Sequence, residues 1–338
     1  MNAHNALDRY LGYLERYLND KDVVEVMINK PVSTSGPATV FVERGGVMEQ
    51  HEDTELTFDR LRQIAQLAAS YSDQPEHTEA YPLIAATLPT GERVQAVLPP
   101  ATVSDRVVIA IRKHTHTNLS LEDYRDNGAF RLTKQTNLES ENIYRELESL
   151  YREGTFYEFT KMAIDSRLTI LISGGTSSGK TTFLRACLRA ISQDERIITI
   201  EDSLELQLVR PNTVPLLYPR QGTQTNRHTA QDLVQASLRL RPDRIFLGEL
   251  RGPEAFDFLE AVNSGHPGSA ASIHANSSYL ARAKLAMLVS RAKTNMTYDS
   301  IVRLIDTTID VAIHCARRGP GDWGIQEVYF PKAAAAAE

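Results

Sequence analysis

The chain has 338 residues, of which 42% are hydrophobic and 24% charged, with a net charge of −6 and a pI near 5.9. This is the composition of a globular protein long enough for two domains, and it excludes an intrinsically disordered chain. The apolar stretches fall well short of the roughly 20 residues of a membrane span. The first residues lack the basic flank and apolar core of a signal peptide, and the acidic balance argues against a protein that coats duplex DNA.

The first 113 residues are predicted to form a small α+β domain. Leucines recur at helical spacing over residues 6–20, and Phe58–Ser70 has the pattern of an amphipathic helix. Gly45-Gly46 marks a hairpin turn. Short runs of β-forming residues, separated by Gly or Pro, predict strands at Val23–Asn29, Thr39–Arg44, Val47–His51, Leu83–Leu88, Arg93–Leu98 and Arg106–Arg112. Helices mixed with short, turn-linked strands indicate the α+β class.

A polar segment follows, and we interpret residues 114–142 as a linker with one short helix at Ser120–Asn127. From about residue 143 to 331 the pattern alternates between strand and helix. Strands are predicted at Leu168–Ser173, Arg196–Glu201, Arg244–Gly248 and Ser269–His274, and helices at Thr181–Ile191, Ala230–Leu240, Glu254–Asn263 and Tyr279–Ser290. Apolar strands separated by helices predict an α/β domain, with a mainly parallel sheet covered on both faces.

Cys187 and Cys315 lie far apart in the sequence, each in an apolar segment. This arrangement indicates two buried free thiols in a reducing compartment, and their spacing is not that of metal ligands. The alanine-rich residues 332–338 are expected to be a disordered tail outside the fold.

The most informative segment joins an apolar strand to a helix through G-x-x-x-x-G-K-T. Glycines let successive backbone N–H groups face inward, and the helix N-terminus adds partial positive charge, so the segment is typical of a phosphate-binding loop. The alternative is a Gly/Ser-rich turn before an ordinary helix. Lys180 is predicted to reach the β- and γ-phosphates, and the Thr181 hydroxyl to bind Mg²⁺. The predicted nucleotide-binding loop comprises Gly174, Gly175, Thr176, Ser177, Ser178, Gly179, Lys180, Thr181 and Thr182.

A second strand ends in two adjacent acids, Glu201 and Asp202, with Glu205 close behind. At the carboxyl edge of a parallel sheet, such carboxylates can bind Mg²⁺ through water or orient a nucleophilic water. We predict Glu201 as catalytic and Glu205 as a metal residue acting through water. The alternative is a capped turn, with Asp202 or Ser203 as the cap.

A third apolar run leads into Gly248-Glu249, where a Walker B acid is expected. Glu249 is therefore predicted to polarise the attacking water. Because Gly248 stands where many such motifs have an Asp, metal binding is expected to depend on Thr181 and on Glu201 or Glu205. The arginines around this segment are either solvated or paired with acids, or one of them stabilises transition-state charge at a neighbouring site.

A fourth segment turns through His266-Pro-Gly268 and enters a strand that ends at His274. A histidine at that sheet edge can hydrogen-bond a γ-phosphate or relay its presence to the next element. The alternative is a structural histidine with satisfied hydrogen bonds. We include His274 among the predicted catalytic residues.

In this order after the phosphate loop, these segments resemble the secretion-motor ATPases: the traffic ATPases of type IV secretion, conjugation, type II secretion and type IV pili. The segment at Glu201–Glu205 looks like the family's Asp box, the one at Gly248-Glu249 like its Walker B motif, and the one from His266 to His274 like its His box. The compact length and the absence of a four-cysteine module point away from type II secretion. The segments around Arg93, Leu98-Pro-Pro and Arg112-Lys113 look most like the type IV secretion and conjugation branch. Ser177 departs from the family, which most often has Gly there, so the loop is expected to persist with slightly altered geometry.

The resemblance implies a RecA-like C-terminal domain, ATP and Mg²⁺ as cofactors, and a homohexameric ring with nucleotide between the two domains of each subunit. It also implies that Arg93 and Arg112 bind the nucleotide phosphates, with Arg106 a weaker third, and that residues 114–142 act as a hinge. The implied protein is cytoplasmic, lies peripherally at the inner membrane, and works with the inner-membrane and cytoplasmic ATPase components of a type IV secretion system.

Three other functions stay open at this point. A nucleic-acid translocase is disfavoured because clustered aromatic and basic residues are lacking, and no strong sequence-specific nucleic-acid binding is expected. A small-molecule kinase would share the phosphate loop. The third is a nucleotide switch that binds without hydrolysis.

Overall fold

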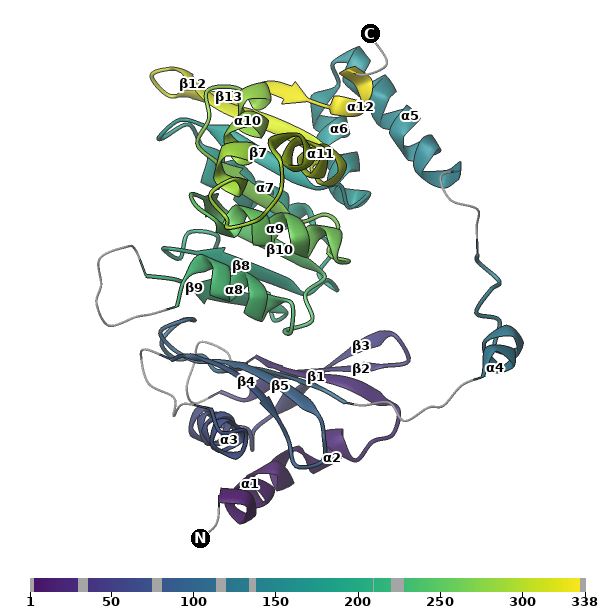
Figure 1. Ribbon diagram of the computed structural model, residues 1–338, viewed down its shortest axis with the longest axis vertical. Helices are drawn as coiled ribbons and strands as arrows, with labels where there is room; N and C mark the ends of the chain where they lie inside the picture. The colour runs from purple at the N-terminus through teal and green to yellow at the C-terminus, as the bar shows by residue number, and fades with distance from the viewer. Residues whose placement is uncertain are drawn as a thin grey trace.

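The computed structural model describes residues 3–29, 36–74, 81–113, 120–133, 138–208, 210–219 and 228–334. They form two domains that stack on one another, and the short helix α4 (Leu121–Asp126) lies to one side of both (Figure 1). This helix confirms the one predicted at Ser120–Asn127, while residues 114–119 and 134–137 of the predicted linker lie outside the described residues. Within the described residues, no helix is both long enough and apolar enough to cross a membrane.

The N-terminal domain is an antiparallel sheet with helices on one face. The strand order is β3-β2-β1-β6-β5-β4. The strands are β1 (Val23–Asn29), β2 (Ala38–Arg44), β3 (Val47–Asp53), β4 (Leu83–Thr87), β5 (Arg93–Val97) and β6 (Val108–Arg112), and the helices are α1 (Ala3–Leu11), α2 (Glu15–Leu18) and α3 (Phe58–Tyr71). The predicted helix over residues 6–20 is interrupted by the 3₁₀ turn Gly12–Leu14, because glycine is a weak helix former.

The two faces of this sheet pack differently, as the two-residue period of a strand requires. Along β1, Val26 and Ile28 belong to the core under the helices. Met27, between them, belongs instead to a core shared with the C-terminal domain. The central strands of the sheet are therefore buried on both faces.

The C-terminal domain has a seven-stranded sheet of order β13-β12-β7-β11-β10-β8-β9, parallel except for the β12–β13 pair. The predicted mainly parallel α/β sheet is confirmed. Its strands are β7 (Ile170–Gly174), β8 (Ile197–Glu201), β9 (Thr213–Leu217), β10 (Arg244–Leu250), β11 (Ala270–Ile273), β12 (Val311–Gly319) and β13 (Asp322–Tyr329).

Helices cover both faces of this sheet. One face carries α8 (Ala230–Ser237), α9 (Glu254–Asn263), α10 (Ser278–Val289) and α11 (Tyr298–Thr308). The other carries α5 (Leu138–Glu153), α6 (Phe156–Asp165) and α7 (Lys180–Ala190). The strands β9, β12 and β13 and the helices α5, α6, α11 and α12 were not among the predicted elements.

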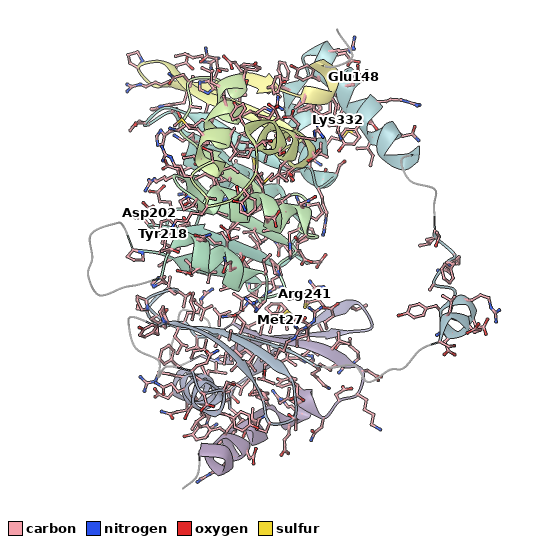
Figure 2. The ribbon with its side chains drawn as sticks, in the orientation of Figure 1. Met27, Glu148, Asp202, Tyr218, Arg241 and Lys332 are labelled. Carbon is pink, nitrogen blue, oxygen red and sulfur yellow. The ribbon has the colours of Figure 1, made fainter. Side chains whose placement is uncertain are left out.

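The C-terminal end packs onto this second face. Helix α12 (Pro331–Ala334) follows β13, and Ala333 is buried in the same core as Phe330. Lys332 of this helix, labelled in Figure 2, places its Nζ 3.1 Å from the ring centroid of Tyr144 on α5. The fold therefore continues past the boundary expected at residue 331. Residues 335–338 of the expected tail lie outside the described residues.

The domains meet at the edge strand β9. The Leu217 N–H donates to Ala101 O at 2.9 Å, and the Thr102 hydroxyl donates to Pro215 O at 2.7 Å. Arg196 joins the two domains from within the interface. Its guanidinium is fully buried and donates to Asn29 of the N-terminal domain and to Asn212, and burial lowers the pKa of Arg196 to about 9.

A second inter-domain bridge lies nearer the surface. Arg241 Nε donates to Glu43 Oε2 at 2.7 Å, and Figure 2 shows Arg241 and Met27 at the boundary between the domains. Apolar packing and charged bridges together hold the N-terminal domain on the β9 side of the larger sheet.

Candidate functional site

The phosphate loop lies between β7 and α7, as predicted. All five residues of β7 are buried, and α7 starts at Lys180. Gly179, immediately before the helix, has φ of 90°, a left-handed conformation that a side chain would strain. The loop therefore delivers the unpaired N–H groups of the first helical turn, with their partial positive charge, to one end of the sheet. This is the physical basis of an anion site.

Ser177 also adopts a left-handed conformation, with φ of 57°. Glycine accepts this backbone geometry freely, whereas an L-residue pays about 1–2 kcal/mol. The backbone conformation at this position therefore favours glycine, the residue that the secretion-motor ATPases most often have there. Serine keeps the left-handed turn in this chain.

Gly174 closes the loop against the neighbouring strand β12. A Cβ added there would lie 2.5 Å from the backbone oxygen of Cys315 and 2.3 Å from Ser178 Oγ. The backbone oxygen cannot move without shifting β12. Ser178 Oγ is buried and has no hydrogen-bond partner among the residues that the structure describes. The loop is thus tightly built and offers a hydroxyl to a ligand.

Gly174→Ala is expected to lower the free energy of unfolding by about 2 kcal/mol, because the added methyl group overpacks the junction of β7 and β12. Gly175→Ala is the matched control, since a Cβ there meets nothing within 4 Å. Urea unfolding of both variants checks this. Equal stability of the two would contradict the close approach at Gly174.

Lys180 is held at the mouth of the loop. Its Nζ donates to Gly174 O at 2.9 Å and to Gly175 O at 2.8 Å, and the residue is 7% exposed. Burial lowers the pKa of Lys180, and the nearby Glu249 carboxylate raises it in part. A partly desolvated ammonium bound to neutral carbonyls gains from an arriving anion.

Three of the predicted catalytic residues come together here. His274 Nδ1 lies 3.5 Å from Lys180 Nζ, and its Nε2 lies 3.2 Å from Glu249 Oε1. The imidazole therefore stands between the ammonium of α7 and the carboxylate at the end of β10. These groups come from segments far apart in the chain and form one continuous polar line beside the phosphate loop.

Arg251 was not among the predicted site residues. Its guanidinium bridges two acids, donating to Glu249 Oε2 at 2.7 Å and to Asp202 Oδ2 at 2.6 Å. The hydrogen bond that Arg251 donates to Glu249 is the main reason that the pKa of Arg251 is raised. Glu249 and Arg251 are two residues apart at the end of a strand, so their side chains lie on the same face of the sheet. This spacing is visible in the sequence and could have predicted their contact.

The Glu201 carboxylate accepts hydrogen bonds from the backbone of the turn that follows β8. Its carboxylate is buried and accepts the N–H groups of Glu205 at 2.8 Å and Leu206 at 2.7 Å, together with the Thr199 hydroxyl at 3.1 Å. Burial is the main cause of its raised pKa, which these hydrogen bonds partly offset. The geometry is that of a capped turn, as in the alternative interpretation, but Glu201 rather than Asp202 or Ser203 supplies the oxygens.

The predicted magnesium residues lie on different elements. Thr181 is in the first turn of α7, while Glu205 is exposed after β8, where its backbone oxygen accepts from Arg185. Within the described ranges, no hydrogen bond or ion pair joins the Glu205 carboxylate to Thr181, and no three His, Cys, Asp or Glu side chains form a group able to hold a metal.

The structure does not bring the predicted phosphate arginines to the loop of their own chain. Arg93 and Arg112 are register partners on β5 and β6, and Arg112 Nε lies 3.0 Å from Glu25 Oε1. Arg106 donates to Thr213 O on β9 at 2.8 Å, and burial lowers its pKa. The N-terminal domain contacts β9, and β11, β10 and β8 separate that strand from β7.

A phosphate loop at the carboxyl edge of a mainly parallel sheet, followed by a strand-end acid, defines a P-loop nucleotide-binding protein. The family model described as Type II/IV secretion system protein matches residues 17–319. The chain therefore belongs to this family, and within it to the VirB11-type ATPases of type IV secretion.

Curated relatives and a solved structure agree with this placement. The type IV secretion system protein VirB11 of Bartonella quintana (strain Toulouse) is 34% identical over 330 residues, which cover 94% of this chain and 90% of the relative. VirB11 of Brucella suis is 36% identical over 314 residues, covering 91% and 85%. The crystal structure of the VirB11 ATPase from the Brucella suis type IV secretion system, in complex with sulphate, superimposes with a TM-score of 0.87 at 33% identity, covering 99% of this chain and 98% of that one. The recognition of a type IV secretion ATPase is confirmed.

Proposed function

We propose that this chain hydrolyses ATP as a ring of six identical subunits and thereby drives assembly of, or substrate transfer through, a type IV secretion channel. The observation that carries the hydrolytic part is the polar line from Lys180 through His274 to Glu249 beside the phosphate loop. The VirB11 relatives support the secretion role.

In the proposed reaction Lys180 exchanges its two carbonyl partners for oxygens of the β- and γ-phosphates. Water attacks the γ-phosphorus as the bond to the ADP oxygen breaks, and the Glu249 carboxylate orients that water and accepts its proton. The proton then passes to the released phosphate. His274, between the cation and the carboxylate, is placed to respond when the γ-phosphate departs.

The proposed cofactor is magnesium, held mainly by the nucleotide and by water. Mg²⁺ usually keeps several waters and takes phosphate oxygens together with few protein ligands. The Thr181 hydroxyl would hold it directly and Glu205 through water. When bound, the ion neutralises negative charge on the phosphates during transfer.

The homohexamer and the arginine roles also belong to this proposal. For Arg93 or Arg112 to meet a nucleotide, either the N-terminal domain moves relative to the β9 edge, or the arginines serve the loop of a neighbouring subunit. We further propose a cytoplasmic protein at the inner-membrane surface, working with the other ATPase and inner-membrane components of the system.

Phosphate release from Mg-ATP by the purified protein tests the proposed activity. Turnover without a phosphorylated acceptor supports an ATPase over a small-molecule kinase, and measurable turnover removes a non-hydrolysing switch. Strong stimulation by single-stranded DNA would instead support a nucleic-acid translocase. Particle symmetry by electron microscopy, with and without ATP, tests the ring of six.

His274→Ala is expected to uncouple turnover from secretion more than it weakens nucleotide binding. The imidazole is half exposed and contacts Lys180 and Glu249 from the side, so we expect the Kd for ATP to change by about threefold at most. Secretion in complemented cells should fall well below what the residual turnover predicts. His51→Ala, an exposed histidine of β3, is the control. A parallel loss of binding, turnover and secretion would contradict the relay role.

A further inference from the structure

The linker between the two domains contains an ordered but fully exposed segment. Residues 120–133, the strap, begin with the six-residue helix α4, whose N-terminus has a capping box between Ser120 and Asp123. Gly128, with φ of 73°, follows the helix, and turn hydrogen bonds continue as far as Thr133. Every residue of the strap is exposed. Because an isolated helix this short is marginal in water, the strap needs a surface to pack on.

The strap carries four large apolar side chains that are left exposed in a single chain. Leu121 is 70% exposed and Leu132 75%, and Tyr124 and Phe130 are each about half exposed. Leu121 and Tyr124 are three residues apart on α4, so they share one face of that helix. A cluster this apolar on an ordered segment indicates a contact surface rather than a solvated linker.

A groove between α10 and α11 of the C-terminal domain offers a matching surface. It holds a cavity of about 170 Å³, lined in part by Tyr279 and Tyr298, which are 64% and 59% exposed. Leu280 and Met287 of α10 are about half exposed as well. The cavity is smaller than the usual small-molecule site, so it suits a single anchoring side chain of another protein segment.

The two surfaces carry opposite net charge. The strap has three acidic and two basic residues. Residues 278–308, which comprise α10, α11 and the loop between them, have five basic and two acidic residues. Complementary charge favours encounter and fixes the orientation of two surfaces. The α10–α11 groove therefore matches the strap in both apolar character and charge.

We propose that the strap of one subunit docks on the α10–α11 groove of a second copy, with its aromatic side chains as anchors. In Figure 1, α4 lies well apart from α10 and α11 of its own chain, so the contact joins two subunits. The inference rests on the self-association in the proposed function and names a surface for it. Because the strap and the groove are different surfaces, the contact is head-to-tail, and such contacts generate rings when the rotation closes.

Cysteine cross-linking tests the contact and its direction. Tyr124→Cys or Phe130→Cys in one full-length chain is co-expressed with Tyr298→Cys in a chain that carries a second tag, and the complex is oxidised. The native Cys187 and Cys315 are buried, so they are not expected to react. We expect a reducible dimer that carries both tags. Absence of this dimer from associated particles would overturn the inference, as would a bond formed only within one chain that carries both substitutions.

Loss of the anchors should weaken assembly without unfolding the subunit. Tyr124→Ala combined with Phe130→Ala is expected to weaken self-association about tenfold or more, measured by sedimentation with Mg-ATP, and Tyr298→Ala should act alike. Tyr157→Ala, which removes an α6 aromatic that is 75% exposed, is the control and should change nothing. Unchanged association of the strap and groove variants would overturn the inference while leaving the proposed ring intact. Wild-type protein that stays monomeric with Mg-ATP would refute the ring itself.

Discussion

Lys180→Ala is expected to reduce ATP turnover by a factor of about 10² or more and to weaken Mg-ATP binding. The ammonium is the cation that the loop holds on its own carbonyl oxygens, so its removal leaves the phosphates without that charge. Phosphate release and calorimetric titration with Mg-ATP measure the two effects.

The matched control is Lys161→Ala, which removes an exposed lysine of α6 that pairs with Asp165. It should retain wild-type turnover. Near-normal turnover in Lys180→Ala, with wild-type unfolding behaviour, would refute the assignment of Lys180 to the phosphates.

Glu249→Gln is expected to bind ATP within about threefold of wild type but to hydrolyse it about 10²–10⁴-fold more slowly. The amide keeps the shape of the side chain and lacks the charge that accepts a proton. Arg251 retains Asp202 as a partner in this variant, so the local structure should persist. Single-turnover hydrolysis measured beside ATP binding checks this prediction.

Glu260→Gln on the exposed side of α9 is the control for the loss of one carboxylate. If Glu249→Gln turned over normally, the catalytic role would pass to Glu201 or Glu205. Of these, Glu201 already accepts two backbone N–H groups. Glu205 would then be the first variant to test.

Most of the strands that the sequence predicted are short runs rich in β-forming residues. The predicted Val23–Asn29 matches β1 residue for residue. The edge strand β9 was missed because Pro215 lies in its centre, and proline weakens a strand assignment except at an edge. Strand β12 was missed because the buried His314 interrupts its apolar run, and β13 was missed because its residues are exposed or only partly buried.

The site residues that could be predicted are those whose chemical role follows from a short sequence motif. The loop, Lys180, Glu249 and His274 were each identified from their segments, and the structure brings the three side chains together. The bridge made by Arg251 and the turn capped by Glu201 depend on which strands lie side by side. Sequence patterns do not specify that proximity without the sheet order.

The β9 edge has a consequence for dissecting this protein. Its outer backbone groups meet Ala101 and Thr102 of the N-terminal domain, and Met27 and Phe41 complete the apolar packing nearby. If the C-terminal domain were produced alone, the backbone N–H and C=O groups on the outer edge of β9 would be exposed to solvent, next to exposed apolar side chains. Such an edge can pair with a strand of another molecule. The smaller domain thus shields this edge of the larger one from strand pairing with another chain.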